Sequence, residues 1–199
     1  MKNLYDKKHK TFVLDGVWKE VMGEPERHGA WIIYGLEKNG KTWFALLLAD
    51  YLARFGKVLY ISAEEGAGSA FVDACARARI SPNKKGLNVI EYEPMEDVSS
   101  YLKKRKSARI VFIDNITIYA DELKNGAFRK LLKEHPDVLF IFLAHEERGE
   151  PYTATAKLCR KLAKLIFHVQ GLACTVSGRC PGGKLVIDEQ RAALYHGQD

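Results

Sequence analysis

The segment Gly35-Leu36-Glu37-Lys38-Asn39-Gly40-Lys41-Thr42 matches the pattern G-x-x-x-x-G-K-[ST] without a gap. Its glycines allow the backbone to wrap closely around a phosphate group, and the N-terminus of a following helix adds positive potential. In such a loop Lys41 neutralises the β- and γ-phosphates, and the hydroxyl of Thr42 binds Mg²⁺. The predicted nucleotide contacts are Gly35, Leu36, Glu37, Lys38, Asn39, Gly40, Lys41, Thr42 and Trp43.

The segments around this loop provide the context that a phosphate-binding loop requires. The apolar run Ala30–Tyr34 predicts a buried strand before it, and Lys41–Phe55 has the periodicity of a helix after it. Further strands are predicted at Val58–Ser62, Leu87–Tyr92, Ile110–Asp114 and Val138–His145, with helices at Ser69–Ala78, around Val98–Leu102, near Asp121–Glu134 and at Ala154–Lys164. Three last strands, Leu165–Val169, Ala173–Ser177 and Lys184–Asp188, have no helix between them. We therefore expect an α/β fold, a three-layer P-loop NTPase sandwich whose mainly parallel sheet has antiparallel strands at its C-terminal edge.

Composition narrows the class of protein. The 199 residues are 47% hydrophobic and 28% charged, which excludes intrinsic disorder and a coiled-coil rod. We expect one domain over residues 13–199, preceded by a basic, flexible leader at residues 1–12. The cysteines form no C-x-x-C pair, and no apolar run resembles a signal peptide or a membrane span. These features predict a cytoplasmic protein without a membrane partner.

Acidic residues follow two of the predicted strands. Asp114 ends the apolar run Ile110–Asp114, where a second Mg²⁺ ligand is expected beside the phosphate loop. Glu64 and Glu65 follow the strand Val58–Ser62 and could orient the water that attacks the γ-phosphate. Either glutamate could instead stabilise the start of the next helix, since acidic residues are favoured there. The sequence leaves open which of the two faces the water.

Together these segments resemble the RecA-type ATPase core, and most closely its RadA, KaiC and DnaB-helicase branch. The resemblance implies an ATP- and Mg²⁺-dependent ATPase, with Glu64 as the catalytic glutamate, Asp114 as the Walker B aspartate and His145 as a γ-phosphate sensor. The late segment Thr175–Asp188 resembles a hairpin whose arginine reaches the nucleotide of a neighbouring subunit. Arg179 matches that arginine, although Ser177 stands where the family has a lysine. The resemblance thus implies a homo-oligomer, either a ring or a filament.

The partner is less clearly indicated than the nucleotide. A formal charge of +6 and a basic helical face, formed by Lys157, Arg160, Lys161 and Lys164, favour DNA. The loop Glu146–Thr155, which would hold DNA in the family, is acidic and disfavours it. We therefore expect a RecA-like core for DNA replication, recombination or repair, of a size that suits a phage or mobile element. The alternatives are a KaiC-like ATPase that regulates a protein partner without DNA, and a nucleotide-dependent assembly module.

Overall fold

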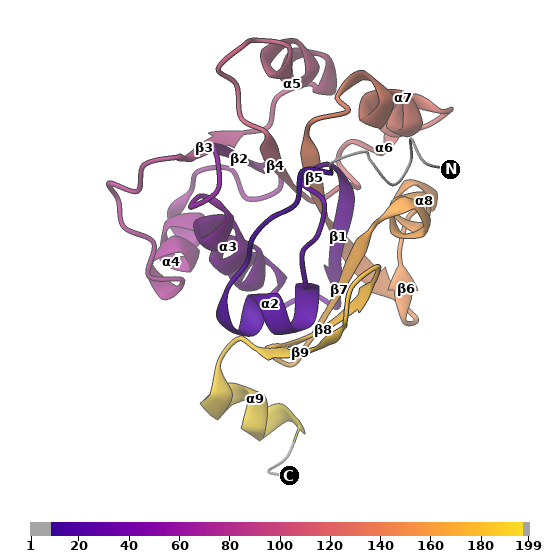
Figure 1. The fold of residues 1–199 in the computed structure, drawn as a ribbon. Helices are drawn as coiled ribbons and strands as arrows, with labels where there is room; N and C mark the ends of the chain where they lie inside the picture. The colour runs from indigo at the N-terminus through magenta and orange to yellow at the C-terminus, as the bar shows by residue number, and fades with distance from the viewer. Residues whose placement is uncertain (1–8, 197–199) are drawn as a thin grey trace, which may run out of the picture.

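The structure is a computed structural model that describes residues 9–196, and their strands form one nine-stranded sheet (Figure 1). The strands lie in the order β3-β2-β4-β5-β1-β7-β8-β9, and the short β6 pairs with β5. The strands are β1 (Gly29–Gly35), β2 (Val58–Ser62), β3 (Leu87–Glu91), β4 (Ile110–Asp114), β5 (Leu139–Glu147), β6 (Glu150–Pro151), β7 (Leu165–Gln170), β8 (Ala173–Gly178) and β9 (Gly183–Val186). Six neighbouring strands run parallel, namely β3, β2, β4, β5, β1 and β7, whereas β8 and β9 pair antiparallel at one edge of the sheet. The predicted fold class is confirmed.

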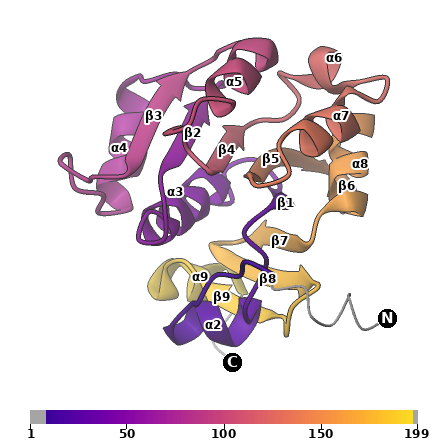
Figure 2. The ribbon, with the colours of Figure 1, turned by 45° about the horizontal axis from the view of Figure 1, so that its top comes forward.

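Helices cover both faces of the sheet (Figures 1 and 2). They are α2 (Gly16–Met22), α3 (Lys41–Leu52), α4 (Ser69–Arg77), α5 (Met95–Leu102), α6 (Ala120–Leu123), α7 (Ala127–Glu134), α8 (Ala154–Leu162) and α9 (Glu189–His196). Buried residues of α2, α3 and α4 belong to one apolar core, and those of α5, α6, α7 and α8 belong to another. The three layers are therefore helices, sheet and helices.

The central strand β1 separates the two cores. Trp31 and Ile33 belong to the core with α3, whereas Ala30, Ile32 and Tyr34 belong to the core with α8. This alternation follows from the period of two along a strand, and burial on both sides explains why Ala30–Tyr34 reads as a continuous apolar run. Strand β1 pairs with β5 on one side and β7 on the other, so the loop after Gly35 emerges at the middle of the sheet.

Several helical segments differ from the sequence-based expectation. The helix predicted near Asp121–Glu134 is divided into α6 and α7, because Asn125 and Gly126 have φ values of 52° and 89°. A left-handed pair of residues cannot continue a right-handed helix. Helices α2 and α9 were not predicted; each is short, at 7 and 8 residues. The helix predicted to reach Lys164 ends at Leu162.

The expected leader, residues 1–12, lies outside the described residues as far as residue 8. Its last residues pack against the body of the protein. Phe12 is only 1% exposed and contacts the ring of Trp31, and Thr11 forms an isolated β-bridge with Glu26. Among residues 9–196, no helix is both long and apolar enough to cross a membrane.

Candidate nucleotide site

The phosphate loop joins β1 to α3 at the carboxyl edge of the parallel strands. Gly40 precedes the helix with φ 94°, a left-handed conformation that glycine adopts without the steric cost of a Cβ. Gly35 ends β1 so close to β7 that a Cβ there would lie 2.1 Å from the carbonyl oxygen of Val169. Both glycines of the sequence pattern are thus required by local packing as well as by a phosphate ligand.

The turn between β7 and β8 holds the loop from one side. The amide oxygen of Asn39 accepts a hydrogen bond of 2.7 Å from the backbone N–H of Gly171. The backbone N–H of Leu172 donates to the carbonyl of Asn39 at 3.3 Å, and the side chain of Leu172 lies against Gly40. Asn39 therefore links the phosphate loop to the antiparallel edge of the sheet, a contact that the sequence pattern did not indicate.

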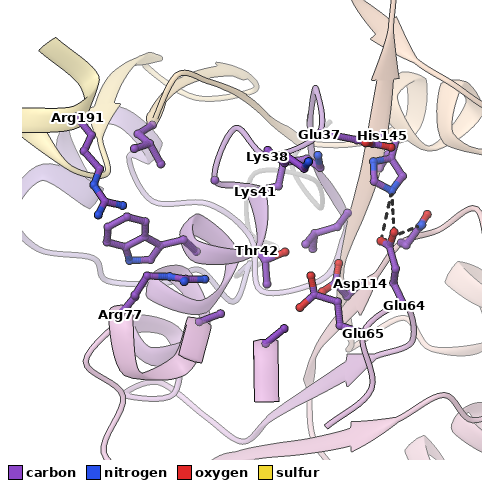
Figure 3. Close-up of a pocket in the computed structure, with 18 residues that line it drawn as sticks. Glu37, Lys38, Lys41, Thr42, Glu64, Glu65, Arg77, Asp114, His145 and Arg191 are labelled. Atoms are coloured by element: carbon purple, nitrogen blue, oxygen red, sulfur yellow. Dashed lines mark hydrogen bonds and ion pairs between the residues drawn. The ribbon is translucent and has the colours of Figure 1, made fainter. Parts of the chain in front are cut away.

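A pocket of about 570 Å³ lies over this loop, and Figure 3 shows the residues that line it. It brings together Lys41, Thr42, Asp114, Glu64 and His145, which come from four separate parts of the sequence. The other predicted contacts in its lining are Glu37, Lys38, Gly40 and Trp43, together with Glu65. Gly35, Leu36 and Asn39 are not part of the lining, although Asn39 and Gly35 shape the loop. The site residues predicted from the sequence thus largely converge.

The side chain of Lys41 points back into the loop, where its ammonium donates to the carbonyl oxygen of Leu36 at 2.8 Å. Burial lowers the pKa of Lys41, and the carboxylates of Glu64 and Asp114 act in the opposite direction. A partly desolvated ammonium beside a loop of backbone N–H groups attracts an anion strongly, because little water competes with the interaction.

Asp114 ends β4 and is almost fully buried, at 4% exposure. Its carboxylate accepts a hydrogen bond of 3.1 Å from the hydroxyl of the buried Tyr60. Burial raises the pKa of Asp114 to about 7, the hydrogen bond from Tyr60 lowers it, and the charges of Glu64 and Glu65 raise it further. A cation bound next to this carboxylate would favour its ionised form.

The oxygen donors present suit Mg²⁺ held jointly with a nucleotide. Thr42 supplies a hydroxyl and Asp114 a carboxylate, and the hydroxyl of Ser62, the β-sheet partner of Asp114, is buried without a hydrogen bond. Among the described residues no group of three or more His, Cys, Asp or Glu side chains could hold a metal ion alone. Mg²⁺ commonly keeps several waters and binds through one or two protein oxygens and phosphates, so these residues fit it.

Glu64 is held by two neighbours. The side-chain amide of Asn115 donates to it at 3.0 Å, and Nε2 of His145 lies 3.3 Å from both of its carboxylate oxygens. Asn115 has φ 69°, and its amide oxygen accepts from the backbone N–H of Thr117 at 3.0 Å, which leaves the amide nitrogen for Glu64. In Figure 3 Glu65 lies nearer Asp114, and Glu64 lies nearer His145.

Three polar or charged lining residues were missed by the sequence reasoning. Asn115 follows Asp114 directly, so an asparagine after a strand-ending aspartate was the available signal. Arg77 at the end of α4 and Arg191 on α9 also line the pocket. Nothing in the sequence around these arginines indicates a nucleotide, because their place depends on how α4 and α9 pack.

Arg179 does not line the pocket of its own chain. It follows β8, whose last residue, Gly178, pairs with Leu165 at the start of β7. Leu165 is at the amino end of β7, whereas the phosphate loop follows the carboxyl end of β1. Because β1 and β7 run parallel, Arg179 and the phosphate loop lie at opposite ends of these strands. The role of Arg179 in a neighbouring subunit therefore stays a prediction.

The basic residues predicted to contact DNA are partly engaged within the chain. Arg160 forms an ion pair of 2.6 Å with Glu150 and lies over the ring of Tyr34. Lys164, just beyond α8, forms an ion pair with Glu26. Lys157 and Lys161 are exposed. The acidic loop is likewise structured, since its Glu146 pairs with His168 at 2.7 Å.

The fold agrees with that of a solved protein. The chain superposes on the flagellar accessory protein FlaH from Methanocaldococcus jannaschii with a TM-score of 0.63, covering 91% of this chain and 96% of that one at 17% identity. No protein-family model and no curated protein matches the sequence. At this identity the similarity shows the fold alone, and the chemistry of the site depends on the residues themselves.

Proposed function

We propose that this protein binds ATP together with Mg²⁺, hydrolyses it slowly in the absence of a partner, and uses the nucleotide state to control a partner protein. The observation that carries the proposal is the convergence of Lys41, Thr42, Asp114 and Glu64 on one pocket. A loop lysine, two oxygen ligands for a cation and a carboxylate beside them are the groups that phosphoryl transfer needs.

Each of these residues has a separate role in the proposed reaction. The loop N–H groups and Lys41 hold the β- and γ-phosphates, and Thr42 and Asp114 would hold Mg²⁺, which neutralises charge on the phosphates. Glu64 orients a water and accepts its proton as the water oxygen attacks the γ-phosphorus and the bond to the β-phosphate oxygen breaks. The products are ADP and inorganic phosphate. His145 and Asn115 keep the carboxylate of Glu64 in place.

A protein partner is favoured over DNA by the ion pairs on the basic surface. Arg160 and Lys164 each have a carboxylate partner within the chain, so a DNA phosphate would have to compete with Glu150 or Glu26. The structural neighbour FlaH is described as a flagellar accessory protein, a description that names no nucleic acid. Control of a protein assembly is therefore the partner class that we propose.

A DNA-dependent ATPase is the second candidate, and one observation favours it. Lys157 and Lys161 are exposed on α8 and form no ion pair with another described residue. They would supply only part of a phosphate contact surface. Acceleration of hydrolysis by single- or double-stranded DNA, lost in a Lys157→Ala/Lys161→Ala double variant, would support this second candidate and contradict the first.

Nucleotide binding and hydrolysis by the full chain test the proposal itself. Lys41→Ala should abolish binding of a fluorescent ATP analogue, whereas Lys133→Ala, the same substitution on the exposed surface of α7, should leave it unchanged. Glu64→Gln should bind ATP and lose roughly 10²- to 10⁴-fold in turnover, as expected for a general base. Turnover of Glu65→Gln, compared with that of Glu64→Gln, shows which of the two glutamates acts as the base. Hydrolysis that survives in Glu64→Gln would remove Glu64 from the mechanism.

Oligomerisation belongs to the same proposal. Arg179 lies at the sheet edge opposite the pocket of its own chain, so it could act only in a neighbouring subunit. Such an arginine would neutralise charge that develops on the transferred phosphoryl group. Turnover per subunit should then rise with protein concentration and fall in Arg179→Ala without loss of ATP binding. Turnover that is independent of concentration would count against a ring or filament.

A further inference from the structure

The pocket has two chemically different ends (Figure 3). Glu64, His145 and Asp114 lie at one end, whereas Arg77 and Arg191 lie together at the other, beyond Thr42. No other described residue forms a hydrogen bond or ion pair with either guanidinium in the structure. Trp43 lines the pocket as well, and its indole nitrogen is buried without a hydrogen-bond partner. These three side chains offer hydrogen-bond donors and positive charge that find no partner among residues 9–196.

Helix α9, which carries Arg191, is fixed to the phosphate loop through the turn between β7 and β8. Its residue Ala192 is buried, and the imidazole of His196 lies 3.1 Å from the carbonyl oxygen of Gln170. The ring of Tyr195 lies so close to Gly171 that a Cβ there would be 2.1 Å from it. Gly171 in turn donates to Asn39 of the loop. Arg191 is thus held at the pocket by the same turn that supports the loop.

The placement of the catalytic groups sets the direction in which a nucleotide would lie. In the proposed function the γ-phosphate would lie next to Glu64, and Thr42 and Asp114 would hold the cation beside the phosphates. The rest of the nucleotide must then extend away from Glu64, toward Arg77 and Arg191. A planar guanidinium stacks on a nucleobase and donates to ring nitrogens and ribose oxygens, and an aliphatic or ammonium side chain does not replace both interactions.

We propose that Arg77 and Arg191, on two elements separated by more than half of the chain, form the subsite for the nucleoside part of the bound nucleotide, its base and ribose. Trp43 contributes a wall of this subsite. The inference depends on the nucleotide binding proposed above, and it assigns α9 a role in ligand recognition. It adds a contact that the phosphate-loop pattern does not include.

Calorimetric titration of the full chain with Mg-ATP and with Mg-tripolyphosphate separates the nucleoside from the phosphates. Arg77→Ala and Arg191→Ala should each weaken ATP binding by roughly 5- to 30-fold and change tripolyphosphate binding by less than about 2-fold. Arg129→Ala, the same substitution on the exposed surface of α7, should change neither. Arg77→Lys and Arg191→Lys keep the charge and should recover little of the lost ATP affinity if stacking is the interaction.

Each result has a defined meaning. Equal losses of ATP and tripolyphosphate affinity would show that the arginines bind phosphate and would overturn the nucleoside assignment. Unchanged ATP affinity in both variants would overturn it as well. A wild-type chain that binds neither ligand would contradict the proposed function instead. Thermal unfolding of each variant, with a melting temperature near that of the wild type, confirms that α4 and α9 remain folded.

Discussion

The contact between Asn115 and Glu64 gives a prediction in which a single charge is changed. Asn115→Asp keeps the size of the side chain and its tolerance of the left-handed backbone. The turn in which the backbone N–H of Thr117 donates to the side-chain oxygen of residue 115 should therefore persist. The variant replaces the amide donor, 3.0 Å from Glu64, with a second carboxylate at a similar distance. Two carboxylates this close cannot both be ionised without a large electrostatic cost, so one proton should be shared between them.

The size of the effect follows from that distance. At a separation of 3.0 Å, two unit charges repel by about 1.4 kcal/mol in water and about 5.5 kcal/mol at an effective dielectric constant of 20. The side chain of Glu64 is 44% exposed, which places the repulsion between these limits, at about 2–4 kcal/mol. Since 1.36 kcal/mol corresponds to one pH unit, the acid limb of the pH–rate profile should move upward by about 1–3 units.

The assay is steady-state ATP hydrolysis between pH 5.5 and 9, with nucleotide affinity measured at each pH. Turnover of Asn115→Asp should fall most at the acid end of this range and recover as the pH rises, since the shared proton is then lost. Asn125→Asp is a matched control, because Asn125 also has a positive φ, 52°, and lies between α6 and α7. A pH–rate profile that coincides with that of the wild type would refute the positioning of Glu64 by Asn115.

Three further predictions concern the fold that supports the site. Gly35→Ala places a Cβ 2.1 Å from the carbonyl oxygen of Val169. We therefore expect the free energy of unfolding in urea to fall by several kcal/mol, at or above the usual ~1–3 kcal/mol for overpacking. An unchanged free energy of unfolding would contradict this packing. Tyr60→Phe removes the hydroxyl that donates to Asp114, and unfolding at pH 8 should show a loss of about 1.5–3 kcal/mol. Burial, aided by the charge of Lys103, lowers the pKa of His135, so the native state binds fewer protons than the unfolded state and stability should fall as the pH drops below about 6.5. His135→Gln should flatten that fall between pH 7.5 and pH 5.5, and an unaltered pH dependence would exclude His135 as its source.

The elements around the phosphate loop could be predicted because the apolar pattern of their residues reflects how each element is buried. Ala30–Tyr34 and Ile110–Asp114 are continuous apolar runs, and strands buried on both faces require such runs. The division between α6 and α7 was not predicted, since the periodicity of Asp121–Glu134 continues across Asn125 and Gly126 while the backbone does not. Helix α9 was missed because its only buried apolar residue is Ala192, which leaves little amphipathic signal.

The sequence by itself determined the phosphate loop, the alternation of strands and helices around it, and the residue types that meet at the carboxyl edge of the sheet. These depend on local spacing and on the periodicity of apolar residues, which are properties of short segments. Only the tertiary structure decided which groups touch Glu64, that Arg77 and Arg191 share one end of the pocket, and that Arg160 and Lys164 are engaged by Glu150 and Glu26. Those contacts join residues that lie 10 to 138 positions apart, and the packing of whole elements, which no short segment encodes, brings them together.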